Sequence, residues 1–151
     1  MAHQKETASF LTLNKRSFCF NEQGTGKTAS AIWAADYLMS IGRIKRALII
    51  SPLSIMQSAW QADLFKFAVH RKVGIAYGDR TKRKAVINSD ADFVVINYDG
   101  IEIVAEDIIF AGFDLIIIDE ANAYKTPKIG RAHVWTPVTS LSRMPSSAWK
   151  K

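Results

Sequence analysis

Residues 21–28 read Asn-Glu-Gln-Gly-Thr-Gly-Lys-Thr, and this stretch decides the fold class. It joins a short apolar run at 18–20, typical of a strand, to the helical pattern that follows. Glycines in such a turn let the backbone approach an anion, which then faces the unpaired N–H groups of the new helix. The stretch therefore predicts a cradle for nucleotide phosphates, with Lys27 neutralising the β- and γ-phosphates and the Thr28 hydroxyl on Mg²⁺.

The cradle departs from the strict eight-residue pattern at one position, because Asn21 stands where the first glycine belongs. A tight turn with a surface lysine is the alternative interpretation. We favour the cradle, and we predict that its phosphate contacts come from Gly24, Thr25, Gly26, Lys27 and Thr28.

A second motif, at 113–120, reads Phe-Asp-Leu-Ile-Ile-Ile-Asp-Glu. Such an apolar run fits a strand buried on both faces of a parallel sheet, and ligands bind at the carboxyl ends of these strands. We therefore expect Asp119 to hold Mg²⁺ and Glu120 to polarise an attacking water. Alone, the motif could be a strand followed by a solvated acidic turn. The two motifs together favour a site for ATP and Mg²⁺.

The rest of the chain alternates between two kinds of pattern. Apolar runs typical of strands lie at 17–20, 47–50, 73–77, 93–96 and 115–118. Stretches with helical spacing lie between them, at 28–40, 53–69, 79–88 and 100–110. Strands that alternate with helices predict an α/β fold, in which helices flank a parallel sheet as three layers.

Residues from 129 onward resemble a translated sequencing adapter rather than natural protein. The strings Ile-Gly-Arg-Ala-His-Val at 129–134 and Ser-Arg-Met-Pro-Ser-Ser-Ala-Trp at 142–149 match the two ends of a common adapter. Trp135 and Trp149 fall on its TGA codons, and Lys150-Lys151 on the poly-A that follows. We therefore expect 1–128 to form the domain and 129–151 to be an artefactual, disordered tail. A genuine polar tail is the alternative.

Composition sets only loose limits on function. The chain has 20 basic and 14 acidic residues, a net charge of +6, but four of the basic residues lie in the expected tail. The remaining sixteen against fourteen leave +2, which is weak support for nucleic-acid binding. One cysteine cannot form an intramolecular disulfide, and no secretory signal or membrane-length apolar run is visible. We expect a soluble protein of the cell interior.

Together the motifs resemble the first RecA-like lobe of helicase superfamily two, and within it the Swi/Snf-type DNA-dependent ATPases, including small phage versions. The resemblance runs from His3 to about Lys128: 22–28 resembles motif I, and 119–122 the DEAD/DEAH-box-like motif II. It implies a P-loop NTPase sheet, Lys27 and Glu120 as catalytic residues, and a bacterial or phage-infected cytoplasm. It also implies that Gln4 reads the adenine edge; a merely exposed glutamine is the alternative.

Two further segments resemble the family's nucleic-acid rim. Residues 51–60 resemble motif Ia and its helix, which makes Ser51 and Ser54 candidate phosphate contacts; helix capping is the alternative. Residues 95–100 resemble the family's Ile-Asn-Tyr-Glu segment, which would place Asn97 and Tyr98 on the rim; a strand cap and turn is the alternative.

Three other features have simpler interpretations. We expect Trp60 and Phe67 in the core rather than stacked on bases. A basic cluster could touch DNA, but a solvated helix face is the expectation; it comprises Arg80, Lys82, Arg83 and Lys84. Tyr-Lys-Thr-Pro at 124–127 resembles the segment that follows motif II in the family.

The resemblance also implies parts that the sequence lacks. The family has a third motif after motif II and then a second RecA-like lobe with arginine fingers. We expect this chain to be a truncated lobe that is inactive by itself, from a parent that couples ATP hydrolysis to movement on DNA. The alternatives are another superfamily-two member, such as a restriction translocase or RNA helicase, and an inactive nucleotide-binding fragment. A P-loop kinase is disfavoured because no arginine-rich lid follows.

Overall fold

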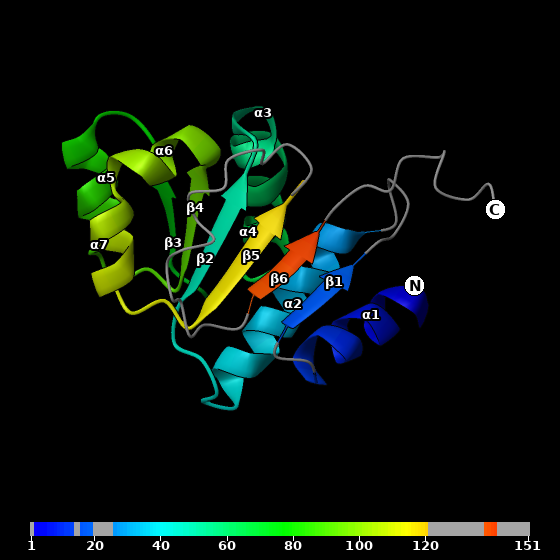
Figure 1. Ribbon diagram of the computed structural model, residues 1–151. Coiled ribbons are helices and arrows are strands. Elements are labelled where there is room, and N and C mark those ends of the chain that lie inside the picture. The colour runs from blue at the N-terminus through cyan, green and yellow to red at the C-terminus, as the bar shows by residue number, and fades with distance from the viewer. Residues whose placement is uncertain (1, 14–15, 20–25, 121–137, 142–151) are drawn as a thin grey trace.

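The computed structural model describes residues 2–13, 16–19, 26–120 and 138–141, which form one parallel sheet with helices on both faces (Figure 1). The sheet has six strands in the order β1-β6-β5-β2-β4-β3, and every described pairing is parallel. The strands are β1 Arg16–Cys19, β2 Ala47–Ser51, β3 Val73–Ala76, β4 Phe93–Asn97, β5 Leu115–Asp119 and β6 Val138–Leu141. The predicted α/β fold with a parallel sheet is confirmed.

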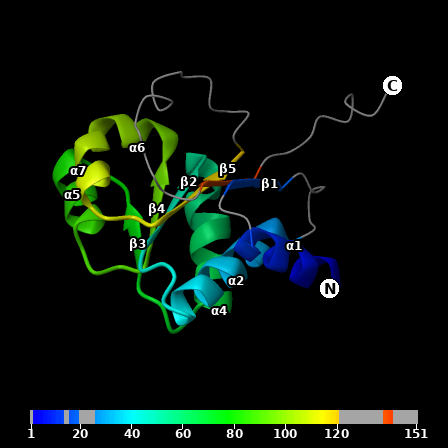
Figure 2. The same cartoon turned by 60° about the horizontal axis from the view of Figure 1, so that its bottom comes forward.

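Alternate strand residues supply two separate cores, which makes the fold three-layered (Figure 2). In β2, Ala47 and Ile49 enter the first core, and Leu48 and Ile50 enter the second. The first core is covered by α1 (Ala2–Leu13), α2 (Lys27–Ser40), the π-helical segment η1 (Met56–Gln61) and α4 (Ala62–Phe67). The second is covered by α5 (Arg80–Ile87), α6 (Tyr98–Ile103) and α7 (Ala105–Phe110).

Two of the predicted helices are broken. The stretch 53–69 is divided into α3 (Leu53–Ile55), η1 and α4, and the stretch 100–110 is divided into α6 and α7 around Val104. A π-helix places one extra residue in each turn, so it rotates the following side chains relative to an α-helix. In η1 this wider turn has Met56 and Trp60 both fully buried, which confirms Trp60 as a core residue. Phe67 is partly buried and packs against the same core.

The strand β6 corrects one expectation. Residues 129–151 were expected to be a disordered tail, yet β6, within that range, lies between β1 and β5, with Thr139 opposite both Ser17 and Ile117. Val138, Thr139 and Leu141 are a β-branched and apolar set that favours a strand, and the sheet supplies a partner on each side. The rest of 129–151 lies outside the described residues, so the adapter interpretation stays a prediction.

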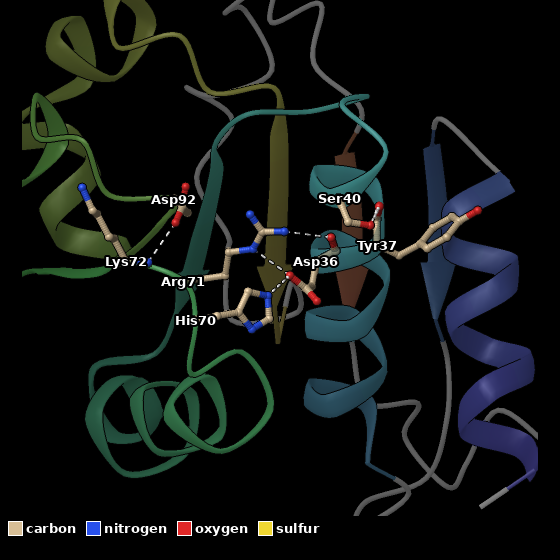
Figure 3. A network of polar contacts seen from close by, with 7 residues as sticks. All are labelled: Asp36, Tyr37, Ser40, His70, Arg71, Lys72 and Asp92. Carbon is tan, nitrogen blue, oxygen red and sulfur yellow. Dashed lines mark hydrogen bonds and ion pairs between the residues drawn. The ribbon is translucent and has the colours of Figure 1, made fainter.

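Polar contacts tie α2 to the loop before β3 (Figure 3). The Asp36 carboxylate accepts from Arg71 Nε at 2.7 Å, and His70 Nε2 lies 2.8 Å from the same oxygen. The backbone N–H of Lys72 donates to Asp92 at 2.8 Å, which fixes the start of β3 against β4. Among the described residues, no helix is long and apolar enough to cross a membrane.

Candidate nucleotide site

The described part of the phosphate cradle lies at the amino end of α2. Gly26 caps this helix in the left-handed region, at φ 74° and ψ 34°, where a side chain is strained and glycine is not. Its carbonyl accepts from the backbone N–H of Ser30 at 3.0 Å and from the Ser30 hydroxyl at 3.1 Å. Lys27 and Thr28 follow in the first turn, both partly exposed. Gly24 and Thr25 lie outside the described residues.

Gln4 lies directly against this cradle. A Cβ atom added to Gly26 would meet Gln4 Nε2 at 2.0 Å, so the glutamine side chain of α1 occupies the space that only a glycine leaves open. The structure therefore brings Gln4 to the start of α2, although the two segments are separate in the sequence. Whether Gln4 reads an adenine edge stays a prediction.

Asp119, the last residue of β5, is held by a hydrogen bond that the sequence did not reveal. Trp60 Nε1 donates to Asp119 Oδ2 at 2.9 Å, and the Trp60 side chain is fully buried. Burial raises the pKa of the Asp119 carboxyl above its ordinary value, and the charge of Glu120 raises it further. The hydrogen bond from Trp60 and the charge of Lys27 oppose that rise. The cradle lysine and the strand-end carboxylate therefore lie within electrostatic range of each other.

Glu120 follows at once and has an unusual backbone. Its φ is 54°, and among the described residues it is the one non-glycine with a positive φ. Such a conformation costs of order 1–3 kcal/mol and occurs most often at functional sites, where the surrounding structure enforces it. The turn moves Glu120 off the strand axis immediately after Asp119.

Asn97 and Tyr98, at the end of β4 and the start of α6, have their side chains engaged inside the protein, and Tyr98 contacts Asp119. The Tyr98 hydroxyl donates to the main-chain carbonyl of Asp119. The Asn97 side chain is 4 % exposed, and its amide oxygen accepts from Arg83 Nη1 at 2.8 Å. Arg83 therefore holds the Asn97 side chain in the interior of this structure, and a contact of Asn97 with nucleic acid stays a prediction. The Tyr98 hydroxyl is likewise used internally.

The motif Ia serines are divided between interior and surface. Ser51 is fully buried in this structure, and its contact with a nucleic-acid phosphate stays a prediction. Ser54 is exposed and remains a predicted phosphate contact. The alternative, helix capping, is not seen either, since α3 begins after Pro52 with no side-chain cap.

Arg83 also departs from expectation. The basic cluster was expected to be a solvated helix face, and Arg80, Lys82 and Lys84 are indeed exposed. Arg83 is instead 6 % exposed and donates to the carbonyls of Ala76 and Gly78 at 2.8 Å each, as well as to Asn97. Gly100 leaves room for this guanidinium, since a Cβ there would lie 2.0 Å from Arg83 Nη1.

The residues present fit a nucleotide-bound magnesium ion better than a protein-enclosed metal. Among the described residues no group of three His, Cys, Asp or Glu side chains could hold a metal. Mg²⁺ is commonly bound by one or two carboxylates together with substrate phosphates and waters. Asp119 and Thr28 would be the few protein ligands of such an ion.

Comparison with known proteins places this site in a family. Residues 3–143 match the model of the SNF2-related domain. Over 91 residues the chain is 31% identical to "Putative protein p41" of Acyrthosiphon pisum secondary endosymbiont phage 1, a match that covers 58% of the chain and 20% of that protein.

Solved structures share the fold, among them two from Sulfolobus solfataricus. The Sulfolobus solfataricus SWI2/SNF2 ATPase core in complex with dsDNA is 24% identical with a TM-score of 0.80, covering 95% of this chain and 31% of that one. The Sulfolobus solfataricus SWI2/SNF2 ATPase core domain is 23% identical with a TM-score of 0.75, covering 93% of this chain and 30% of that one. This chain thus spans less than a third of either structure. It belongs to the SNF2-related domain family, as an N-terminal RecA-like lobe.

Proposed function

We propose that this chain is the ATP-binding lobe of a DNA-dependent ATPase that moves on or remodels DNA. The carrying observation is the convergence of the two motifs at one edge of the sheet. Both β1 and β5 end there, where Cys19 and Asp119 lie level with Leu141. The helix α2 begins at Lys27, behind the left-handed Gly26. Membership in the SNF2-related family supports ATP hydrolysis as the chemistry.

The roles follow from charge and position. Lys27 and the backbone N–H groups of 24–28 bind the β- and γ-phosphates. Thr28 and Asp119 hold Mg²⁺, which neutralises charge on the phosphate oxygens when it is bound. Glu120 orients the attacking water, and Gln4, beside Gly26, contacts the base. Positioning and charge stabilisation, not covalent chemistry, carry the reaction.

DNA is the proposed partner of the whole two-lobe protein. One Sulfolobus ATPase core with this fold is a complex with dsDNA, which supports the proposal by analogy. Among the candidate contacts on this lobe, Ser54, after β2, is exposed in the structure. The second lobe would supply an arginine finger, worth about 10³–10⁵ in rate, so the isolated lobe binds ATP without DNA-stimulated turnover. The protein would act in a bacterial or phage-infected cytoplasm.

ATP hydrolysis tests this proposal when it is measured with and without double-stranded DNA. The 151-residue chain alone should show no stimulation. A chain extended by a second lobe should be stimulated, and Glu120→Gln should abolish that activity while ATP still binds. Stimulation by RNA in place of DNA would support an RNA helicase instead. Strong DNA-stimulated hydrolysis by the isolated chain would show that no second lobe is needed.

A further inference from the structure

Trp60 does more than fill the core with its aromatic ring. Its indole N–H also makes a hydrogen bond at the proposed site. The indole N–H lies 2.9 Å from Asp119 Oδ2, across 59 residues of sequence. Trp60 is fully buried, so the core fixes the position of this donor. A buried indole N–H needs an acceptor, and here the acceptor is the carboxylate at the end of β5.

A second donor holds the same residue from another element. The Tyr98 hydroxyl, at the start of α6, donates to the main-chain carbonyl of Asp119. Trp60 lies in the segment after β2, and Tyr98 directly after β4. The residue is therefore fixed at its side chain and at its backbone by two neighbouring strand-to-helix segments.

Fixing a carboxylate in this way matters for a metal. A carboxylate that can rotate presents its oxygens in many directions, and ordering it on metal binding costs entropy. Hydrogen bonds from outer groups remove that freedom beforehand, and their loss typically lowers metal affinity about 10–100-fold. The rigid, buried indole is suited to this task because the core fixes its position.

We propose that Trp60 is a positioning residue for magnesium: its indole N–H orients the Asp119 carboxylate toward a nucleotide-bound Mg²⁺, with Tyr98 fixing the backbone beneath it. The inference rests on the proposed function, since it assumes that Asp119 binds the metal. It differs from a purely structural role, in which only the bulk of the indole ring would matter.

Conservative variants separate the two roles. Trp60→Phe keeps an aromatic ring in the core but removes the N–H donor. Trp33→Phe is the matched control, because Trp33 is a partly buried tryptophan of α2 that packs edge-on against Phe67, at 5.5 Å between ring centroids. Each variant loses one indole, and only Trp60 donates to Asp119.

The first measurement is a Mg²⁺ titration of a fluorescent ATP analogue bound to the full chain, with a parallel titration in EDTA. Trp60→Phe should raise the Mg²⁺ concentration for half-maximal binding about 10–100-fold. Its affinity for the analogue in EDTA should match the wild type within about twofold, because Lys27 and the backbone cradle are unchanged. Trp33→Phe should change neither quantity.

The second measurement needs no variant to retain activity. In ¹H–¹⁵N spectra of the wild type, the Trp60 indole resonance should shift when Mg²⁺ is added to the ATP-bound chain. It should not shift when Mg²⁺ is added without nucleotide. The resonance is assigned by its absence from Trp60→Phe or, if that variant does not fold, by selective labelling.

The outcomes separate the two proposals. An unchanged Mg²⁺ requirement in folded Trp60→Phe, or an indole resonance that ignores Mg²⁺, would overturn the inference and leave ATP binding intact. A wild-type chain that binds no nucleotide at all would overturn the proposed function itself.

Discussion

Arg83 donates through Nη1 to the amide oxygen of Asn97 at 2.8 Å, and both side chains are more than nine-tenths buried. The other acceptors described for this guanidinium are backbone carbonyls at the end of β3 and just beyond it. One cation therefore joins the ends of β3 and β4 beneath the proposed nucleic-acid rim. A buried charge of this kind is stable only while its hydrogen bonds are complete.

Arg83→Met should destabilise the fold by at least about 2 kcal/mol, because it leaves buried carbonyl and amide oxygens without a donor. Arg80→Met is the matched control: Arg80 is exposed on the same helix, and its loss should change stability by less than about 0.5 kcal/mol. Urea unfolding measures both. Equal, small effects would show that the buried hydrogen bonds of Arg83 contribute nothing.

Gly26→Ala should cost more than Gly42→Ala, although both glycines have φ 74°. At Gly42 a Cβ meets nothing within 4 Å, so that substitution measures only the left-handed backbone, about 1 kcal/mol. At Gly26 the Cβ would also displace Gln4, 2.0 Å away. Adding Gln4→Ala to Gly26→Ala should recover the extra cost in thermal unfolding. No recovery would mean that the two residues are not in contact.

Asp119→Asn should stabilise the ligand-free chain relative to the wild type at neutral pH and progressively less in acid. Burial raises the pKa of Asp119 in the folded state, so the wild type loses stability as pH rises above the ordinary value of 3.8. Asparagine stays neutral and can still accept from Trp60. Unfolding in Mg²⁺-free urea from pH 3 to 7 gives the difference. A stability difference that does not vary with pH would contradict the burial of this carboxyl.

Ending the chain at Lys128 should lower its thermal midpoint, because it removes β6 from between β1 and β5. The described pairing of β1 is with β6, so its loss also leaves β1 without that neighbour. A cost of about 2 kcal/mol would lower the midpoint by roughly 5–10 °C. Equal midpoints for the full and shortened chains would instead favour the adapter interpretation. Sequencing unligated genomic DNA is an independent test, because finding the same codons there would show that 129–151 is not adapter.

The sequence was sufficient to predict those elements whose pattern lies in one contiguous stretch. The apolar run that ends at Asp119 and the glycine turn that precedes Lys27 are contiguous patterns, so β5 and α2 were placed nearly to the residue. Alternating strands and helices then fixed the parallel sheet, because such connections allow few other arrangements.

The sequence was insufficient where distant side chains meet. Nothing near Trp60 shows that its N–H will find Asp119, 59 residues away. Arg83 sits among exposed basic residues, so its burial and its effect on Asn97 depend on the packing of α5 against β3, which brings it to the end of β4. Likewise, the four residues of β6 are too short a pattern to predict a strand by themselves. They form one because β1 and β5 pair with them on either side.

The central claim is that this lobe binds MgATP through the cradle at the start of α2. Isothermal titration calorimetry of MgATP into the wild type and Lys27→Ala tests it most directly, with Lys45→Ala as a control that removes an exposed charge before β2. We predict that Lys27→Ala weakens binding more than tenfold, or about 1.4 kcal/mol, and that Lys45→Ala leaves it unchanged. Equal affinities for the wild type and Lys27→Ala would contradict the account.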